Sequence, residues 1–304
     1  MTQAAALLMD YGSPATTDDV EAFYTHIRHG KPPTQAELDD LRRRYDAIGG
    51  ISPLADRSES QRAAIEAALE RREPGRWKVA LGHKHAPPFL EEAVELLASD
   101  QPAVVVGLVL APHYSRASVG EYHRRAAAAA ESAATPYRPI ESWHLDEAYL
   151  DFCAGAIRRT LDGLPDRTKV LFTAHSLPER ALVGDPYPDQ LWEGARAAAA
   201  RAGLAAWASW SLAWQSAPPG AEAWQGPDVR SVISELGATG RADGVAVCPH
   251  GFVSDHLEVR YDLDMDAAAV AADAGLDFGR TDTVDDDPDV MAALAERLIA
   301  GAAP

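Results

Sequence analysis

The 304-residue chain is long enough for two domains of ordinary size, and its 47% hydrophobic residues supply a core for each. The formal net charge of −18 argues against nucleic-acid and anionic-membrane partners, because their phosphates would repel the protein as a whole. Two cysteines, Cys153 and Cys248, are too few for a disulfide framework, which excludes a disulfide-rich secreted protein.

The first ten residues carry no basic region, and their apolar run is too short for a signal peptide. No stretch reaches the ~18 to 20 apolar residues that a membrane-spanning helix needs. We therefore expect a soluble, cytoplasmic protein with no membrane partner.

In chain order, six short apolar runs predict β-strands, and amphipathic helical patterns lie between them. The predicted strands cover residues 4–9, 79–82, 104–110, 169–174, 207–213 and 244–248. Strands that alternate with helices favour parallel sheets. We predict an α/β fold of two similar, doubly wound parallel-sheet halves with a cleft between them.

Two early helices are well signalled. The first presents one apolar face made of Val20, Phe23, Tyr24 and Ile27. The second opens with a capping box, Thr34 to Glu37, and stops at the glycine pair 49–50.

The change of unit near residues 140–151 predicts a domain boundary. We expect an N-terminal half over 1–145, a C-terminal half over 146–285 and a closing helix over 286–304. The closing helix is marked by Met291, Leu294 and Leu298, and packing back on the N-terminal half is one position open to it.

Loops that leave the carboxyl ends of parallel strands carry function in open α/β sheets. Five unusual segments fall at such points: residues 11–14, 82–85, 111–115, 174–178 and 249–252. Each of them, taken singly, is better explained as an ordinary turn.

His175 directly follows a predicted strand of the second half, so its ring should project into the crevice between the halves. A neutral imidazole there has a pKa suited to accepting a proton near pH 7. The alternative is a structural histidine that hydrogen-bonds the following turn through Ser176 or Glu179.

A row of carboxylates follows Gly251. On an α-helix capped at Ser254 or Asp255, one face would carry Asp255, Glu258, Asp262 and Asp266. Stacked like charges destabilise a helix, and a cation would compensate. Oxygen ligands with one imidazole suit Fe²⁺, Mg²⁺ and Zn²⁺ alike, and a solvated acidic face is the alternative.

Basic residues cluster at Arg28, His29 and Lys31 and again at residues 42–44, beside Tyr45. They could pair with carboxylates of a ligand, or satisfy the carboxyl ends of their own helices. Tyr11 and Tyr122 add phenols. Phosphate-loop, dinucleotide, zinc-protease and C-x-x-C motifs are missing from the sequence.

Taken together, these segments resemble the ferrochelatases over nearly the full length of the chain, and are most similar to the soluble bacterial branch that acts on coproporphyrin III. The matching segments are residues 11–14, 24–28, 44–54, 109–113, 174–178, 184–190, 214–216, 226–228 and 251–258. The resemblance implies a chelatase fold with a tetrapyrrole in the cleft, and a monomer.

The resemblance also implies roles for particular residues. His175 and Glu258 would be the catalytic pair at the metal, with Tyr11 near the opposite face of the porphyrin. Asp262 and Asp266 would be a secondary cation site, where Mg²⁺ is one candidate. The porphyrin and its propionates would be positioned by Arg28, Arg44, Tyr45, Ser52 and Tyr122.

Two departures limit the resemblance: His29 stands where a second arginine is common, and Asp266 replaces a usual glutamate. Some members hold a [2Fe-2S] cluster on four cysteines, and this chain has two, so we predict no cluster.

The predicted function is insertion of Fe²⁺ into coproporphyrin III to give coproheme in haem biosynthesis. Insertion into protoporphyrin IX is one alternative, and a non-catalytic haem or porphyrin carrier is another. The ligand types leave the preference among Fe²⁺, Co²⁺ and Zn²⁺ open.

Overall fold

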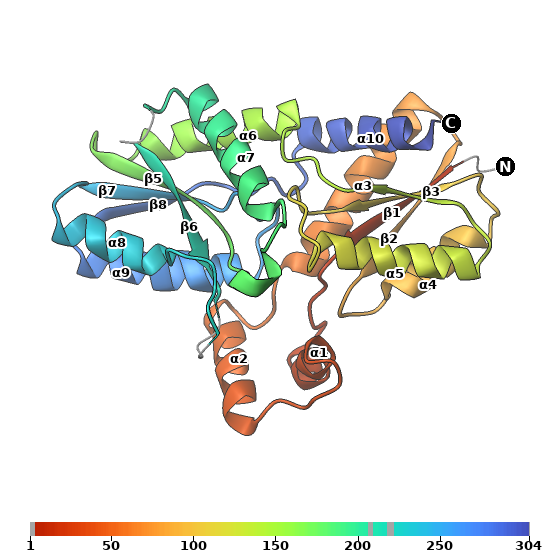
Figure 1. The fold of residues 1–304 in the computed structure, drawn as a ribbon, viewed down its shortest axis with the longest axis horizontal. Coiled ribbons are helices and arrows are strands. Elements are labelled where there is room, and N and C mark those ends of the chain that lie inside the picture. Colours follow the sequence, from red (N-terminus) through yellow and green to blue (C-terminus); the bar gives the residue numbers. More distant parts are fainter. Residues whose placement is uncertain (1–3, 206–208, 218–221, 304) are drawn as a thin grey trace.

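The strands form two four-stranded parallel sheets that lie beside each other in the computed structural model, which describes residues 4–205, 209–217 and 222–303 (Figure 1). The first sheet has the order β2-β1-β3-β4 and the second the order β6-β5-β7-β8. The first contains β1 (Ala4–Asp10), β2 (Trp77–His83), β3 (Val105–Val109) and β4 (Tyr137–Ile140). The second contains β5 (Thr168–His175), β6 (Trp210–Gln215), β7 (Gly244–Cys248) and β8 (Asp277–Arg280).

The two sheets share one topology, and each reverses its strand order beside its first strand. The reversal lies between β1 and β3 in the first sheet and between β5 and β7 in the second. Such switch points open a crevice at the carboxyl ends of the strands, where ligands bind in α/β folds. The prediction of two similar parallel-sheet halves is confirmed.

Helices cover both faces of each sheet. The first sheet has α3 (Leu54–Arg72), α4 (Leu90–Ala98) and α5 (Val119–Ser132) around it. The second has α6 (Glu147–Leu161), α7 (Tyr187–Ala202), α8 (Val229–Ala238) and α9 (Ala268–Asp273) around it, with a short 3₁₀ turn at Glu179–Ala181. Another 3₁₀ turn, Thr17–Asp19, lies in the first half. A doubly wound arrangement requires helices on both faces of a sheet, and both sheets have them.

The helix α10 (Pro288–Ala302) runs back to the first half and packs beside α3, β3 and β4 (Figure 1). Its Leu294 and Leu298 are fully buried in a core that also includes Leu8 and Ile65 of the first half and Phe172 of the second. One continuous core therefore joins the two sheets. We propose that the boundary near residue 145 divides the chain into two units of the same topology, which share that core.

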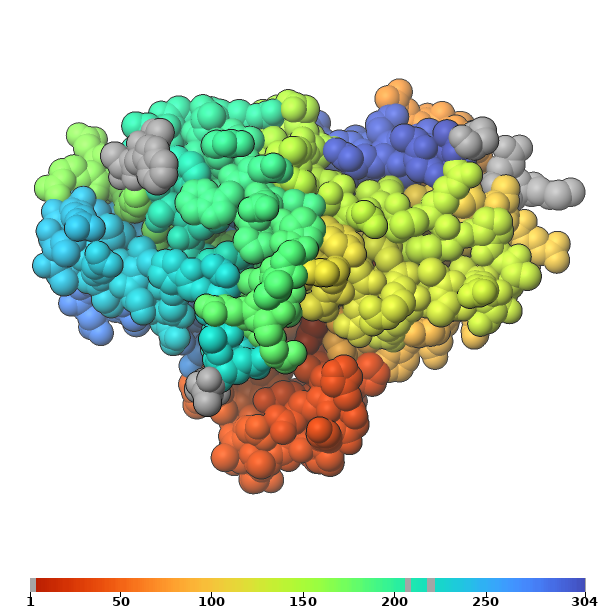
Figure 2. Space-filling model, viewed as in Figure 1, coloured from red at the N-terminus to blue at the C-terminus, as the bar shows by residue number. Residues whose placement is uncertain are grey.

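The helices α1 (Val20–Ile27) and α2 (Gln35–Ala47) form a lobe that projects beyond both sheets (Figures 1 and 2). The predicted capping box starts α2: Thr34 Oγ1 accepts from the Glu37 amide at 3.3 Å, and the Glu37 carboxylate accepts from the Thr34 amide at 2.7 Å. The chain leaves α2 through Gly49 and Gly50, both at positive φ, which glycine adopts at little cost.

Several predicted elements differ from those observed. The edge strands β4 and β8 were not predicted, because they are short and half-exposed and lack an apolar run. The predicted strand over 207–213 corresponds to β6, and its first residue, Trp207, lies outside the described residues. Among the helices of the described part of the chain, none is long and apolar enough to cross a membrane.

Candidate functional site

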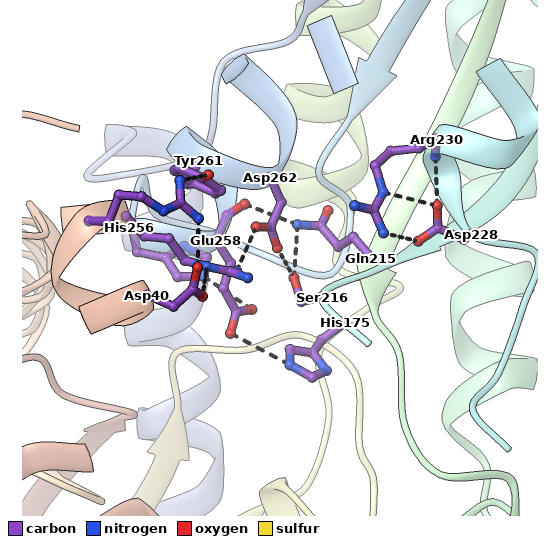
Figure 3. Close-up of polar contacts among 12 residues, drawn as sticks. Asp40, His175, Gln215, Ser216, Asp228, Arg230, His256, Glu258, Tyr261 and Asp262 are labelled. Carbon is purple, nitrogen blue, oxygen red and sulfur yellow. Dashed lines mark hydrogen bonds and ion pairs between the residues drawn. The ribbon is translucent and has the colours of Figure 1, made fainter. Parts of the chain in front are cut away.

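The site is built at the carboxyl ends of β5 and β7, where the second sheet reverses its strand order. His175 is the last residue of β5, and Glu258 lies in the segment after β7, as the N-cap of the π-helix η3 (Val259–Ala267). His175 Nε2 and a Glu258 carboxylate oxygen are 3.5 Å apart, and the two side chains point toward one another (Figure 3). Each side chain keeps 34% of its surface exposed, so a ligand can reach both.

Hydrogen bonds fix which nitrogen of His175 can exchange a proton. Nδ1 donates to the Ser176 carbonyl oxygen, which leaves Nε2 facing Glu258. Glu258 lies between two imidazoles, because its second carboxylate oxygen is 3.8 Å from Nε2 of His256. The His256 ring is held in turn by a 3.0 Å bond from Nδ1 to the Ser254 carbonyl.

The charges of this pair are strongly coupled. Burial of the ring opposes its protonation, but Glu258 outweighs burial and raises the pKa of His175 to about 9. Burial likewise opposes ionisation of Glu258, yet His175 and His256 hold the pKa of Glu258 well below its ordinary value. In the free protein His175 is therefore charged at neutral pH, which corrects the expectation of a neutral imidazole.

The carboxylates that follow do not form the single row that was expected. Asp255 turns away to Arg260 at 3.1 Å, Arg280 at 3.2 Å and Thr283 at 3.2 Å. The segment is a π-helix from Val259 onward, with neither Ser254 nor Asp255 as its N-cap. Within the described residues, no three His, Cys, Asp or Glu side chains converge to hold a metal ion.

Asp262 lies one turn beyond Glu258 in η3. Its carboxylate accepts from Ser216 Oγ and lies 3.7 Å from Arg44 Nη1. Burial, helped by the negative charge of Glu258, raises the pKa of Asp262 to about 6. Asp266 is half-buried further along η3 and adds to the negative potential at Asp262.

The first half contributes phenols. Tyr11, in the loop after β1, is 42% exposed and lies against the ring of His85 with centroids 4.6 Å apart. Burial raises the pKa values of both Tyr11 and Tyr45, and the charge of Glu258 raises them further. Tyr11 and Tyr45 thus lie within electrostatic reach of Glu258.

The remaining predicted positioning residues already have partners within the protein. Arg28 pairs with Glu37 at 2.7 Å, and Arg44 pairs with Asp40 at 2.9 Å. Ser52 is buried, and its hydroxyl accepts from the amide of Leu54 at 3.3 Å, at the start of α3. Tyr122 is buried beneath the ammonium of Lys84, which lies 5.2 Å from the ring centroid.

Sequence reasoning missed four residues that belong to this neighbourhood: Lys84, His85, Gln215 and His256. Lys84 and His85 lie in the 82–85 loop, which its position after a strand had already marked. Gln215 lies at the end of β6 and within the matching segment 214–216, but its residue type alone predicts no role. His256 is two residues before Glu258 and its Nε2 lies 3.8 Å from the carboxylate, a contact that a spacing of two does not predict on a helix.

Comparison with known proteins is consistent with this geometry. The ferrochelatase family profile matches residues 3–301. The coproporphyrin III ferrochelatase of Halalkalibacterium halodurans is 40% identical over 294 residues, which cover 95% of this chain and 94% of that protein. The enzyme of the same name from Geobacillus kaustophilus is 40% identical over 303 residues, or 97% and 95% of the two chains.

Solved structures show the same fold at much lower identity. The sirohydrochlorin chelatase SirB from Bacillus subtilis, in complex with cobalt, aligns with a TM-score of 0.59 at 12% identity over 99% of this chain and 96% of that one. CbiX aligns with a TM-score of 0.55 at 15% identity over 98% of both chains. The chelatase-like fold predicted from the sequence is confirmed, and the chain belongs to the ferrochelatase family.

Proposed function

We propose that the protein inserts Fe²⁺ into coproporphyrin III and so forms coproheme. The observation that carries the proposal is the His175–Glu258 pair, an imidazole and a carboxylate 3.5 Å apart at the carboxyl end of the second sheet. The family match and the names of the relatives at 40% identity support the reaction and the substrate.

The reaction exchanges two pyrrole N–H protons for one Fe²⁺. His175 Nε2 is the position at which a proton can be taken up, because Nδ1 is occupied by the Ser176 carbonyl. Glu258 stabilises the imidazolium that results, and the imidazole and carboxylate are ligands that Fe²⁺ accepts. A cleft that favours a bent macrocycle over a flat one adds rate, because bending exposes the nitrogen lone pairs.

The proposed porphyrin contacts are Tyr11, Tyr45, Tyr122, Ser52, Arg28 and Arg44. Arg28 and Arg44 are salt-bridged to carboxylates of the same lobe, and propionates can exchange with these carboxylates at both guanidinium groups. Four propionates on coproporphyrin make more use of such groups than the two on protoporphyrin.

We also place a hydrated divalent cation, with Mg²⁺ as one candidate, beside Asp262 and Asp266. The support is electrostatic: burial and the neighbouring Glu258 make the charged form of Asp262 unfavourable, and a cation would relieve that cost. Ser216 and Arg44 already contact the Asp262 carboxylate, so the cation would approach with its water shell.

Anaerobic assays test the reaction directly. Purified protein is mixed with Fe²⁺ and either coproporphyrin III or protoporphyrin IX, and metallation is followed by absorbance. We expect insertion into coproporphyrin III, and a loss of about a hundredfold or more in rate for His175→Ala, the scale of a positioned proton acceptor. Faster insertion into protoporphyrin IX would reverse the substrate assignment.

Two results would contradict the proposed roles. A His175→Ala variant that works at the wild-type rate would remove the ring from the chemistry. Tight porphyrin binding without metallation of either porphyrin would favour the carrier alternative.

A further inference from the structure

Gln215 connects β5, which ends at His175, with β6 and with η3, which follows Glu258. It is the last residue of β6 and stands in register with His175, the last residue of β5. The amide of Ser176 donates to the Gln215 carbonyl at 2.9 Å, so the backbone just after His175 is tied to the end of β6.

The Gln215 side chain reaches in the opposite direction, toward Glu258. The residue is only 1% exposed, and its Nε2 donates to the Glu258 carbonyl at 3.2 Å (Figure 3). This amide orientation is the one that the surroundings dictate, since a flip would set the side-chain oxygen against the carbonyl oxygen of Glu258.

The next residue strengthens the same link. Ser216 has a φ of 63°, in the left-handed region that costs energy for a residue with a Cβ. A non-glycine residue keeps such a conformation only where its surroundings hold it. Here the turn brings Ser216 Oγ to the Asp262 carboxylate and within 3.5 Å of Gln215 Nε2.

We propose that Gln215 is a positioning residue: its buried amide fixes the start of η3 so that the Glu258 carboxylate faces His175 Nε2. The effect on iron insertion rests on the proposed function. The fixing of the start of η3 rests on the hydrogen bonds alone. Gln215 contacts the backbone of Glu258 and of Ser176, and so acts on the His175–Glu258 pair through the backbone.

The proposed role requires a side chain that is as long as glutamine and donates a hydrogen bond to the Glu258 carbonyl. Methionine has nearly the shape of glutamine without a donor, so Gln215→Met removes the bond and keeps the volume. Gln61→Met is the matched control. Gln61 is also fully buried, donates through Nε2 to the carbonyl of Asp285 at 2.8 Å and, like Gln215, has a side-chain oxygen without a partner among the described residues.

Hydrogen–deuterium exchange on the free protein tests the structural part without any catalysis. We expect Gln215→Met to speed exchange of the η3 backbone amides at least threefold, while Gln61→Met leaves them at the wild-type rate. Unchanged exchange in η3 for Gln215→Met overturns the proposal. An equally large rise in η3 exchange for Gln61→Met would also overturn the proposal.

Steady-state iron insertion tests the catalytic part. Gln215→Met should lower kcat ten- to a hundredfold with the KM for porphyrin within twofold, because small misplacements of reacting groups are costly. In a Glu258→Gln background the same change should alter kcat less than twofold. A full additional loss in that background overturns action through Glu258.

These two arms separate the possible failures. If the wild-type protein inserts no iron, the proposed function fails, and exchange in η3 still decides whether Gln215 holds the helix start. If exchange rises while kcat is unchanged, the proposed function stands and the positioning role is overturned.

Discussion

At the residue scale, the protonation of the His175–Glu258 pair determines when it can act. A pKa of about 9 leaves roughly 1% of the ring neutral at pH 7, and this fraction grows about tenfold per pH unit until the pKa is reached. Only the neutral ring can accept a proton at Nε2. Glu258 thus makes His175 a stronger base and also keeps its ring protonated at neutral pH.

This coupling predicts the pH dependence of kcat/KM, which reports on the free enzyme. For the wild-type protein, kcat/KM for iron insertion should rise between pH 7 and pH 9. In Glu258→Gln the carboxylate no longer offsets burial, so the pKa of His175 falls and the plateau begins at lower pH, with a lower maximum. Superimposable profiles for the two proteins would show that Glu258 does not control His175.

At the scale of elements, one tyrosine joins the projecting lobe to η3. Tyr261 of η3 is buried, and its hydroxyl accepts from Arg43 of α2 at 2.6 Å. The guanidinium groups of Arg43 and Arg44 lie 5.5 and 5.2 Å from the centroid of its ring. A small apolar cluster of Val20, Leu38 and Tyr45, packed against Leu257, adds to the contact.

Because the Tyr261 hydroxyl links α2 directly to η3, its loss should be measurable locally. Tyr261→Phe keeps the ring and removes the hydroxyl, which should cost about 1 kcal/mol and speed hydrogen exchange in α2 by about fivefold. Tyr137→Phe is the control, since the Tyr137 hydroxyl bonds His123 at 2.6 Å beside the first sheet. Equal exchange in α2 for both variants would mean that the Tyr261 hydroxyl does not hold the lobe.

At the scale of the whole molecule, buried histidines make stability depend on pH. Burial lowers the pKa of His250 and His85 to about 3, that of His123 to about 4, and that of His113 well below its ordinary value. His113, His144 and His250 come from three different loops and lie between the two sheets. The ring centroid of His113 is 4.8 Å from that of His250 and 5.7 Å from that of His144.

Below a pH of about 6.5 the unfolded chain binds protons at these rings and the folded chain does not. Each ring therefore lowers the free energy of unfolding by up to about 1.4 kcal/mol per pH unit as the pH falls toward 5. Urea unfolding at pH 7 and pH 5 measures the drop. His250→Gln should reduce it by roughly 1 to 2 kcal/mol, whereas the same change at the exposed His29 serves as the control. An unchanged drop in His250→Gln would exclude that ring as a source.

The sequence by itself determined the fold class and the chemistry. Apolar runs at the central strands, the capping box at Thr34 and the glycines that end α2 are local signals, and each predicts its element without reference to distant residues. His175 and Glu258 were identified because one follows a strand and the other lies in a segment of the family resemblance. The short, half-exposed edges β4 and β8 were missed because their place in a sheet depends on neighbours rather than on an apolar pattern.

Only the tertiary structure decided how these groups act on one another. The carboxylates after Gly251 were expected on one face of an α-helix, but a bend and a π-helix send Asp255 to Arg280 and leave Glu258 between two imidazoles. The protonation state of His175 and the contact of Gln215 with the Glu258 backbone follow from contacts between residues of β5, β6 and the segment at η3, which are distant in sequence. Local patterns specify elements, whereas the distances and burial that set charge arise only when the elements pack together.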